Sequence, residues 1–531
     1  MARFKERLSL SQLTGQGRWV IAAYGLAALG ALAVGILQFR HGIVHLLDTV
    51  TYWSGTEATS NGHPFTTNLA PSFSNFSAIE FLERSGRLPF VDFPVGYPLV
   101  AGIFGFIIGT RHAMELLGVI ALIAIAIAFI AGAKKSTESI LAPFLLGATG
   151  ILITMSPATR MVTQGALSEP LFCAVALWLV IALAKFRSGG KWAPVVALSI
   201  AAGLLRFIGA PLAVLAGWER YQKTGRKLSS LMWTIAMMIP AAINILWASS
   251  AGGGHNAGWR GLGRLDIEVF VRSIGGWFDA KQGDLRRTYF TNEGPSWWSW
   301  VVATAWLAVV IVALYSIMRR RHILTATAEL ALAASAIISA GLVAGMMGFD
   351  ALVIADNRLM LPTGILTLAA IVWSVHQFVS KQTGTRHAQI FSSAMAALVL
   401  FAGLAVRPWN ITESFSDSSE LKPYSIAALQ SGAEIIITND ADGVHWDTGL
   451  PSAYAPLPVK ALTGETQDVT TLYAELPCAL LRHNGVVVLS NDFTFSGANN
   501  ELLAQEVEAD RLIVEATDVA TVYFPTASAC D

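Results

Sequence analysis

Apolar stretches about 20 residues long recur through the first 406 residues of this 531-residue chain. A helix of that length crosses the roughly 30 Å of hydrocarbon in a bilayer. Hydrophobic residues make up 54% of the chain and charged residues only 14%, whereas about a quarter of a soluble globular chain is charged. We therefore expect an α-helical multi-pass membrane protein with about eleven crossings. The predicted spans are 19–39, 113–133, 139–157, 168–184, 192–206, 207–219, 230–248, 298–317, 328–346, 359–377 and 390–406.

Three assignments depend on local detail. The pair within 192–219 is short, and we place its division at Arg206-Phe-Ile-Gly209. A further apolar piece, 97–110, is too short to span comfortably and is expected to lie in the membrane interface. The first span follows a short tail that has no small-residue cleavage site, so we interpret it as a retained helix rather than a signal peptide.

Basic residues predict the orientation, because they fall on alternate connections and short basic connections stay in the cytosol. Residues 40–112, 249–297 and everything after 407 are then extracytoplasmic, in a protein of the plasma membrane. The basic groups are Arg3, Lys5, Arg7 and Arg18; Lys134-Lys135; Lys185, Arg187 and Lys191; Arg220, Lys223, Arg226 and Lys227; Arg319-Arg320-Arg321; and Lys381 and Arg386.

We divide the chain into a transmembrane domain, 1–406, and an extracytoplasmic soluble domain, 407–531. The second is long enough for a small core of its own. Apolar runs at 434–438, 485–490 and 521–524 predict strands, and 421–431 and 500–509 predict helices, so a small α/β domain is expected. In the first outer loop, 77–84 has helical spacing and could lie on the membrane as an amphipathic helix.

The chain has three cysteines. Cys173 lies in a predicted span and is expected to be an inert core residue. Cys478 and Cys530 both lie in the soluble domain, where an oxidising compartment would let them form a disulfide; the alternative is two free thiols.

Asp48 follows the first predicted span, and a carboxylate near lipid is costly unless it is functional or faces water. A sugar transferase on the outer face uses donors carried on polyprenyl phosphate, because nucleotide sugars stay in the cytosol. Such a site needs a carboxylate that takes a proton from the acceptor hydroxyl, cations for the departing phosphate, and an apolar groove for the lipid. Asp48 is the candidate base; the alternative is a solvated loop carboxylate or a helix cap.

Arginines at the outer ends of predicted spans are candidates for the phosphate site. Arg206 and Arg358 each need an anionic partner there, which a donor phosphate or an interfacial lipid headgroup would supply. Asp356 could instead simply pair with Arg358. Arg160 and Glu169 flank another outer turn and are candidate substrate contacts, although Glu169 also suits the first turn of a helix as an acid matched to the dipole.

The remaining candidates carry less information. Tyr52 is a candidate substrate contact, but for Tyr52 and Trp53 an ordinary interfacial aromatic belt is the favoured interpretation. His255 and Arg260 in the second outer loop are further candidate contacts, against the alternative that this loop's basic residues cover acidic lipid heads.

Five short motifs in order resemble the GT-C glycosyltransferase superfamily, over roughly residues 19–375. These are Asp48 after the first span, Phe93-Pro-Val-Gly-Tyr-Pro-Leu99, Ser168-Glu-Pro-Leu-Phe172, Arg206-Phe-Ile-Gly209 and Arg358-Leu-Met-Leu-Pro362. The superfamily includes protein O-mannosyltransferases, aminoarabinose transferases and the mycobacterial-type mannosyl- and arabinofuranosyltransferases. Each motif is short, and their order carries the resemblance.

The resemblance implies an inverting transfer from a polyprenyl-phosphate sugar to a cell-envelope acceptor, with mannose or arabinofuranose favoured as the sugar. It places the family's acidic residue at Asp48 and the phosphate-contacting arginine at Arg358, with Arg206 as a second possibility. The proline-tyrosine element, with Tyr97, would be part of an interfacial helix, and Asp92 would be a second acidic contact for the acceptor.

The sequence departs from the family at the metal site. Many relatives pair two acids in the first loop to hold a divalent cation, whereas Asp48 is followed by Thr49-Val50. A divalent cation is possible, but no metal ligand or other cofactor is assigned. Asp440-Ala-Asp442 lacks the other ligands of a calcium loop and is expected to be a turn at a strand end.

Two other functions are consistent with the hydrophobicity. A lipid-linked sugar flippase or transporter would place charged or broken helices near the bilayer midplane and often has two similar halves, which we do not find. A membrane scaffold would explain the soluble domain but not Asp48 or the outer arginines. Lys and Arg together number 36, as do Asp and Glu, which argues neither for nor against nucleic acid; no nucleic-acid partner is expected.

Overall fold

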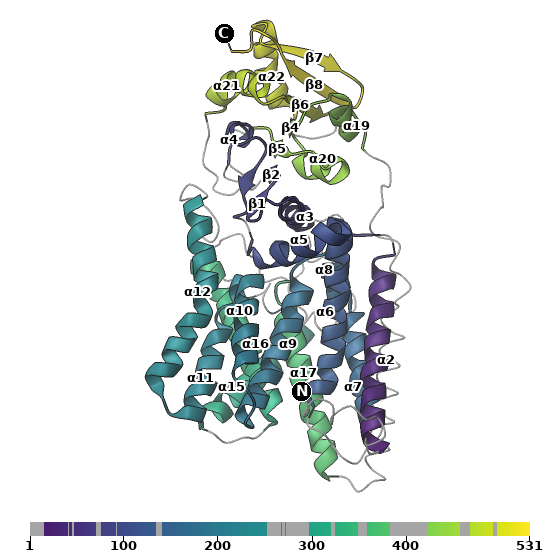
Figure 1. Cartoon of the computed structure of the whole chain (residues 1–531), viewed down its shortest axis with the longest axis vertical. Helices are drawn as coiled ribbons and strands as arrows, with labels where there is room; N and C mark the ends of the chain where they lie inside the picture. Colours follow the sequence, from purple (N-terminus) through teal and green to yellow (C-terminus); the bar gives the residue numbers. More distant parts are fainter. Residues whose placement is uncertain are drawn as a thin grey trace, which may run out of the picture.

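A computed structural model of the chain describes most of its residues. The described residues are 15–40, 42–44, 47–70, 76–91, 93–133, 141–251, 267, 271, 297–319, 324–348, 358–382, 422–456, 468–491 and 496–530. A bundle of roughly parallel and antiparallel helices forms the larger part of the molecule, and a smaller domain that contains a sheet stands at one end of it (Figure 1).

The bundle is built from the apolar stretches that the sequence predicts as spans. Within the described residues six helices are long and apolar enough to cross a membrane, and a bent pair, α7 with α8, would make a seventh. The six are α2 (Gly15–Gln38), α6 (Thr110–Gly132), α9 (Glu169–Arg187), α12 (Lys227–Ala251), α15 (Trp297–Arg319) and α16 (Ala326–Gly348). Many apolar side chains of α12 and α15 point outward, as expected of helices that face lipid. The chain is therefore a multi-pass membrane protein.

The other predicted spans are also helical but shorter or broken. They are α7 (Leu141–Thr154) with α8 (Pro157–Gln164), α10 (Ala193–Leu205), α11 (Leu212–Thr224) and α17 (Leu361–Gln382). The span predicted at 139–157 contains α7 and ends where the chain bends by 63° into α8, a short helix that the sequence analysis did not predict. Ser156 and Pro157 explain the bend, since a Ser N-cap followed by Pro starts a new helix. The predicted span 390–406 lies outside the described residues.

The division predicted at Arg206–Gly209 is confirmed. Helix α10 ends at Leu205, the 3-10 turn η2 (Phe207–Gly209) follows, and α11 returns along the bundle. A Cβ atom at Gly209 would lie 2.2 Å from the carbonyl oxygen of Ala202, so only glycine permits this tight reversal. The reversal leaves Arg206 at the end of the bundle next to the smaller domain, which we call the domain end; the opposite end is the far end.

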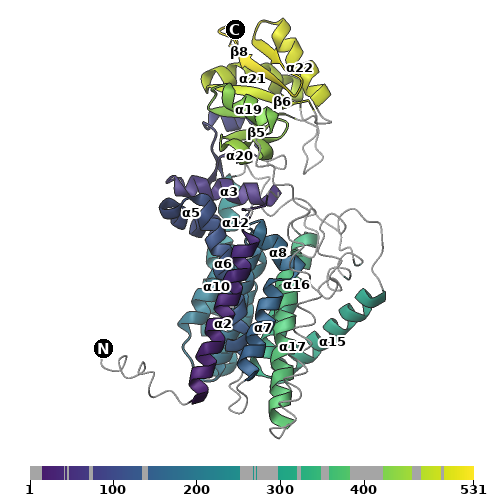
Figure 2. The ribbon, with the colours of Figure 1, turned by 90° about the vertical axis from the view of Figure 1, so that its right-hand side faces the viewer.

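Two helices lie across the domain end instead of along the bundle. They are α3 (Leu47–Ser60) and α5 (Gly96–Ile108), and they pack on each other (Figures 1 and 2). Ile103, Phe106 and Ile107 of α5 are exposed, so this helix has the apolar outer face that the sequence predicts for an interfacial element.

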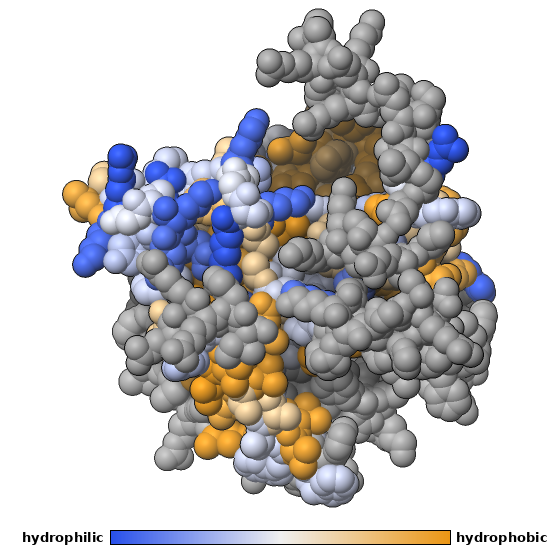
Figure 3. Space-filling model, turned by 90° about the horizontal axis from the view of Figure 1, so that it is seen from below, coloured by the Kyte–Doolittle hydropathy of each residue, from blue (hydrophilic) through white to orange (hydrophobic). Residues whose placement is uncertain are grey.

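A buried charge network ties the helices together at the far end. Arg187 donates to both carboxylate oxygens of Glu219 at 2.5 and 2.6 Å and to Glu329 at 3.1 Å. Exposed basic residues, Lys191, Lys223, Arg226 and Lys227 among them, also lie at this end. Seen from below, hydrophilic side chains gather on one side of the surface and apolar ones cover much of the remaining described part (Figure 3).

The smaller domain is a six-stranded mixed sheet with helices packed on it, in the order β2-β5-β4-β6-β8-β7. The pairs among β2, β5, β4 and β6 are parallel, and those among β6, β8 and β7 are antiparallel. The predicted strands and helices of this domain are confirmed. The elements are α19 (Pro423–Gln430), β4 (Ile435–Thr438), α20 (Ala441–Thr448), β5 (Ser452–Tyr454), α21 (Val469–Arg482), β6 (Gly485–Ser490), α22 (Ser496–Glu508), β7 (Leu512–Ala516) and β8 (Ala520–Pro525).

The first inter-helix loop contributes to this domain. Strand β2 (Leu69–Ala70) pairs with β5 at the sheet edge, and α4 (Ala78–Glu83) buries Phe81 and Leu82 in the same core as Tyr473. The prediction that 77–84 lies on the membrane is therefore wrong, although the helix exists and has a capping box between Ser77 and Glu80. Strands β1 (Thr66–Thr67) and β3 (Leu88–Pro89) form a small separate ladder in this loop.

Cys478 and Cys530 are joined by a disulfide, which fastens α21 to the end of the described chain. Among the described cysteines the remaining one, Cys173, is a buried free thiol on α9.

Replacing Cys478 by serine should leave Cys530 open to maleimide labelling, whereas the unreduced wild type should not label at this site. Loss of the cross-link, which closes a loop of 52 residues, should also lower the unfolding free energy of the domain by about 2–4 kcal/mol. Mass spectrometry of labelled protein and thermal unfolding measure the two effects. Labelling of Cys530 in the unreduced wild type would contradict the pairing.

Candidate active site

Asp48 lies in the first turn of α3, at the domain end of the bundle. The hydroxyl of the next residue, Thr49, donates to the carbonyl oxygen of Gly165 at 2.7 Å, which fastens the start of α3 to the turn between α8 and α9. The Asp48 side chain is 19% exposed, so it is held by the fold and still reaches the surface of the site.

Glu169 is a buried carboxylate between two arginines. It lies in the first turn of α9, and its side chain is only 2% exposed. Its Oε1 atom is 2.7 Å from a guanidinium nitrogen of Arg206 and 3.6 Å from Nε of Arg358. An isolated carboxylate at this depth would be very costly, and the two guanidinium groups supply the partners that offset this cost.

Arg358 connects this group to Asp48, with which it forms an ion pair. The order in space is thus Asp48, Arg358, Glu169, Arg206, in which acids and bases alternate. These four residues come from α3, the turn before α17, α9 and the turn after α10. Two negative and two positive charges balance, so the cluster is neutral while each arginine side chain keeps 15–20% of its surface exposed.

Hydroxyl groups line one side of the charge cluster. Ser168 Oγ lies 2.9 Å from the Tyr52 hydroxyl and accepts from Arg206 at 3.3 Å. Burial raises the pKa of Tyr52 above its usual value, so the phenol remains a neutral hydrogen-bonding group. The Tyr97 ring packs on Tyr52 at 5.2 Å, and its buried hydroxyl has no hydrogen-bond partner among the described residues.

The proline-tyrosine motif places these rings through its glycine. A Cβ atom on Gly96 would lie 2.5 Å from the carbonyl oxygen of Leu204, so glycine is what lets the start of α5 approach the end of α10. That approach holds Tyr97 beside Tyr52 and next to the turn that bears Arg206.

The structure brings together Asp48, Tyr52, Tyr97, Glu169, Arg206 and Arg358 from the predicted candidates. Arg160 lies half-buried on α8 and forms no ion pair with any described residue. Asp92, His255 and Arg260 lie outside the described residues, as does Asp356.

One expectation about the site needs correction. The aromatic-belt interpretation of Tyr52 is wrong, because its side chain is buried against Phe93 and Tyr97 and bonds to Ser168.

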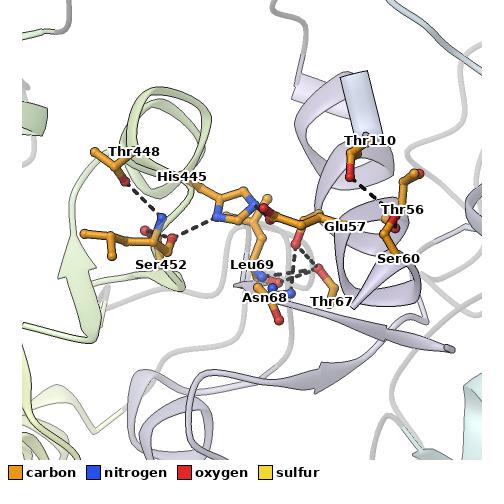
Figure 4. Close-up of polar contacts among 12 residues, drawn as sticks. Thr56, Glu57, Ser60, Thr67, Asn68, Leu69, Thr110, His445, Thr448 and Ser452 are labelled. Carbon is orange, nitrogen blue, oxygen red and sulfur yellow. Dashed lines mark hydrogen bonds and ion pairs between the residues drawn. The ribbon is translucent and has the colours of Figure 1, made fainter. Parts of the chain in front are cut away.

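Polar contacts seat the smaller domain on α3. His445 of α20 directs Nε2 towards Glu57 of α3 at 3.8 Å, while its Nδ1 lies 2.8 Å from the carbonyl oxygen of Leu450 (Figure 4). Burial lowers the pKa of His445 to about 4 and raises that of Glu57, so His445 is neutral near pH 7 and donates from Nδ1. Ser54 of α3 bonds to Thr67 and to the N–H of Asn68, which adds a second link.

Sequence reasoning did not single out Glu57 or His445, and it named Ser168 only as the first residue of a motif, without a role. Ser168 precedes the helical Glu169-Pro170 pair, a pattern that marks helix starts and could have drawn attention to it. Glu57 and His445 are far apart in the chain, and only the docking of α20 on α3 pairs them.

Neither a family model nor a curated protein sequence matches this chain. Solved structures with a similar fold are found. ArnT from Cupriavidus metallidurans bound to undecaprenyl phosphate has a TM-score of 0.53 and 11% identity, over 97% of this chain and 99% of that one. ArnT in the apo state has a TM-score of 0.51 and 11% identity, over 96% of this chain and 99% of that one. The chain has the GT-C fold. The archaeal oligosaccharyltransferase AglB from Archaeoglobus fulgidus scores 0.46 at 11% identity, over 97% of this chain and 75% of that one.

The residue types in the charge cluster determine what it can do chemically. Two arginines can bind a phosphate, and a carboxylate can accept the proton of a hydroxyl. Among the described residues, no three His, Cys, Asp or Glu side chains are grouped as metal ligands. Asp48 has a guanidinium as its ion-pair partner.

Glu169→Gln should lower the unfolding free energy by roughly 3–5 kcal/mol, because it leaves Arg206 and Arg358 without their shared anion. Thermal unfolding in detergent measures the change. The matched control is Glu115→Gln, whose carboxylate pairs with the half-exposed Arg111 at 3.2 Å and should contribute less than about 1 kcal/mol. Equal effects of the two substitutions would refute a structural role for Glu169.

Proposed function

We propose that this chain is an inverting membrane glycosyltransferase that moves a sugar from a polyprenyl-phosphate donor to a hydroxyl of a cell-envelope acceptor. The observation that carries the proposal is the alternating cluster Asp48, Arg358, Glu169 and Arg206 at one end of a GT-C bundle. The likeness in fold to ArnT, solved with undecaprenyl phosphate bound, supports a lipid phosphate as the ligand.

The donor phosphate would bind Arg358 and Arg206. Both guanidinium groups reach the surface of the cluster, and guanidinium binds phosphate through paired, charge-assisted hydrogen bonds. Glu169 holds the two arginines in place from the buried side. The polyprenyl tail would extend into the lipid beside the exposed apolar side chains of α5.

The reaction is a direct displacement. Asp48 removes the proton from the acceptor hydroxyl, whose oxygen attacks the anomeric carbon on the face opposite the phosphate. The bond from that carbon to the phosphate oxygen breaks, and its electron pair leaves with the polyprenyl phosphate. Arg358 and Arg206 stabilise the charge that develops there. One displacement inverts the configuration of the anomeric carbon.

The contact between Asp48 and Arg358 suggests an order of binding. While Arg358 pairs with Asp48, the guanidinium occupies the carboxylate oxygen that an acceptor hydroxyl would need. A donor phosphate competes for the same guanidinium and frees Asp48. The acceptor hydroxyl would then be activated only when a donor is in place, which limits wasteful reaction with water.

The reaction would take place outside the cytosol. Exposed basic residues lie at the far end, and the positive-inside rule assigns that end to the cytosol. The active site and the sheet domain are then extracytoplasmic, where lipid-linked sugars replace nucleotide sugars as donors. The disulfide in the sheet domain is consistent with an oxidising compartment.

The resemblance noted from the sequence favours mannose or arabinofuranose as the sugar. Purified protein assayed with a panel of decaprenyl- and undecaprenyl-phosphate sugars tests the function and identifies the donor. Movement of lipid-linked sugar across vesicles, with no transfer from any donor, would favour the alternative of a flippase or transporter.

Asp48→Asn should reduce kcat by about 10²–10⁴-fold, the range that a general base contributes, while the protein level stays normal. The measurement is sugar transfer by purified protein at saturating donor. Glu83→Gln, an exposed acid on α4, is the control and should leave transfer unchanged. Near-normal turnover of Asp48→Asn would exclude this residue as the base.

Arg358→Ala should raise the donor KM by at least about tenfold and change the acceptor KM much less, because it removes a charged contact to phosphate. Arg111→Ala is the control, since Arg111 is a half-exposed arginine at the same end of the bundle. An unchanged donor KM would remove Arg358 from the phosphate site.

A further inference from the structure

The first turn of α20 lies directly on the helix that bears Asp48. Ala441 packs in one small core with Val50 of α3 and Leu69 of β2. Trp446 contacts Trp53 of α3 with ring centroids 5.1 Å apart. The sheet domain is therefore seated beside the proposed base, and its side chains form part of the surroundings of Asp48.

Two of the three acids on this segment have clear structural roles. Asp440 caps α20 by accepting from the N–H of Gly443 at 3.0 Å, and it also accepts from Tyr424 and from Lys422. Asp447 accepts from Ser425 at 2.8 Å and from the backbone of Lys422 at 3.3 Å. Both carboxylates thus hold α20 to the preceding helix, α19.

Asp442 is different, because half of its carboxyl group is unused. The residue is 2% exposed, and Tyr454 donates to its Oδ2 atom at 3.2 Å. Its Oδ1 atom is buried and accepts no hydrogen bond from the described residues. A buried polar atom without a partner costs about 1–3 kcal/mol, which a fold tolerates where a ligand supplies the missing bond.

The charges around Asp442 indicate which side of the active site it faces. Burial is the main cause that raises its pKa to about 7, with Asp440 and Asp48 raising it further, while Tyr454 and Lys422 oppose the shift. These groups come from α20, α3, β5 and α19, the elements packed around it. Asp48 is the member of the charge cluster among these groups, and Ala441, next to Asp442, packs on Val50, two residues after Asp48, so Asp442 lies beside the end of α3 that bears Asp48.

We propose that Asp442 is an acceptor-binding residue, whose Oδ1 atom accepts a hydrogen bond from a second hydroxyl of the acceptor beside the one that Asp48 activates. The proposal rests on the proposed function. It assigns the acceptor to a polyhydroxylated class, such as a glycan with neighbouring hydroxyls, since a carboxylate binds hydroxyl donors and repels phosphate. It also makes the sheet domain a contributor to the site.

Asp442→Asn tests this with little change in shape. The acceptor KM should rise about tenfold, as expected for loss of a hydrogen bond to a charged group, while the donor KM stays within about twofold. Asp447→Asn makes the same charge change on the same helix, on the side that binds α19, and should leave the acceptor KM unaltered.

A pH profile separates acceptor binding from a merely structural role. In the wild type, kcat/KM for the acceptor should rise as the pH increases through about 7, because the carboxylate ionises there and binds a hydroxyl more strongly. In Asp442→Asn, kcat/KM should lack this rise with pH. Tyr454→Phe removes a hydrogen bond that lowers the pKa of Asp442, so in this variant the rise should occur at higher pH.

The outcomes distinguish the two proposals. The role of Asp442 would be overturned by a normal acceptor KM in an active Asp442→Asn protein. It would also be overturned if the pH dependence of kcat/KM were unchanged in Tyr454→Phe. Either result would leave the glycosyltransferase proposal standing. If the wild type transfers no sugar from any donor in the panel, the proposed function fails and the acceptor site fails with it.

Discussion

Glu169 is the carboxylate on which the arrangement of the domain end depends, because it lies buried between the guanidinium groups of Arg206 and Arg358. Two arginines close together repel each other, and neither would stay near hydrocarbon without an anion. Glu169 lets the fold keep both of them in place before any ligand arrives. Preorganised cations of this kind are effective at stabilising a leaving phosphate, since little reorganisation is needed during the reaction.

Much of the fold could be predicted because hydrophobicity alone determines it. Apolar stretches of sufficient length become helices in a bilayer, and the described part of the chain is helical at each predicted span. Helix α8 and the docking of α4 were missed for different reasons. The first depends on a local Ser-Pro cap, and the second on a tertiary core with Tyr473 that no local pattern reveals.

The residues of the site were predictable where a charged side chain stands at the end of an apolar helix. Asp48, Glu169, Arg206 and Arg358 are charges at the ends of apolar helices, so each one needed an explanation on its own. Their pairing was not predictable, because the order in space joins residues 48, 358, 169 and 206. The sequence predicted Asp442 to be a turn residue. Its carboxylate oxygen without a hydrogen bond becomes apparent only in the structure, where Asp440 and Asp447 do form hydrogen bonds.

Strand β2 is synthesised long before β5, the strand with which it pairs. Leu69 and Ala70 leave the ribosome ahead of most of the bundle, yet they pair with Ser452 and Ala453, which are synthesised after it. The sheet can therefore be completed only once the chain has threaded its helices into the bilayer. A fragment that begins after residue 406 would have an open edge at β5, and an unpaired edge strand readily joins to other chains. Membrane insertion and folding of the outer domain are thus coupled in one sequence of events.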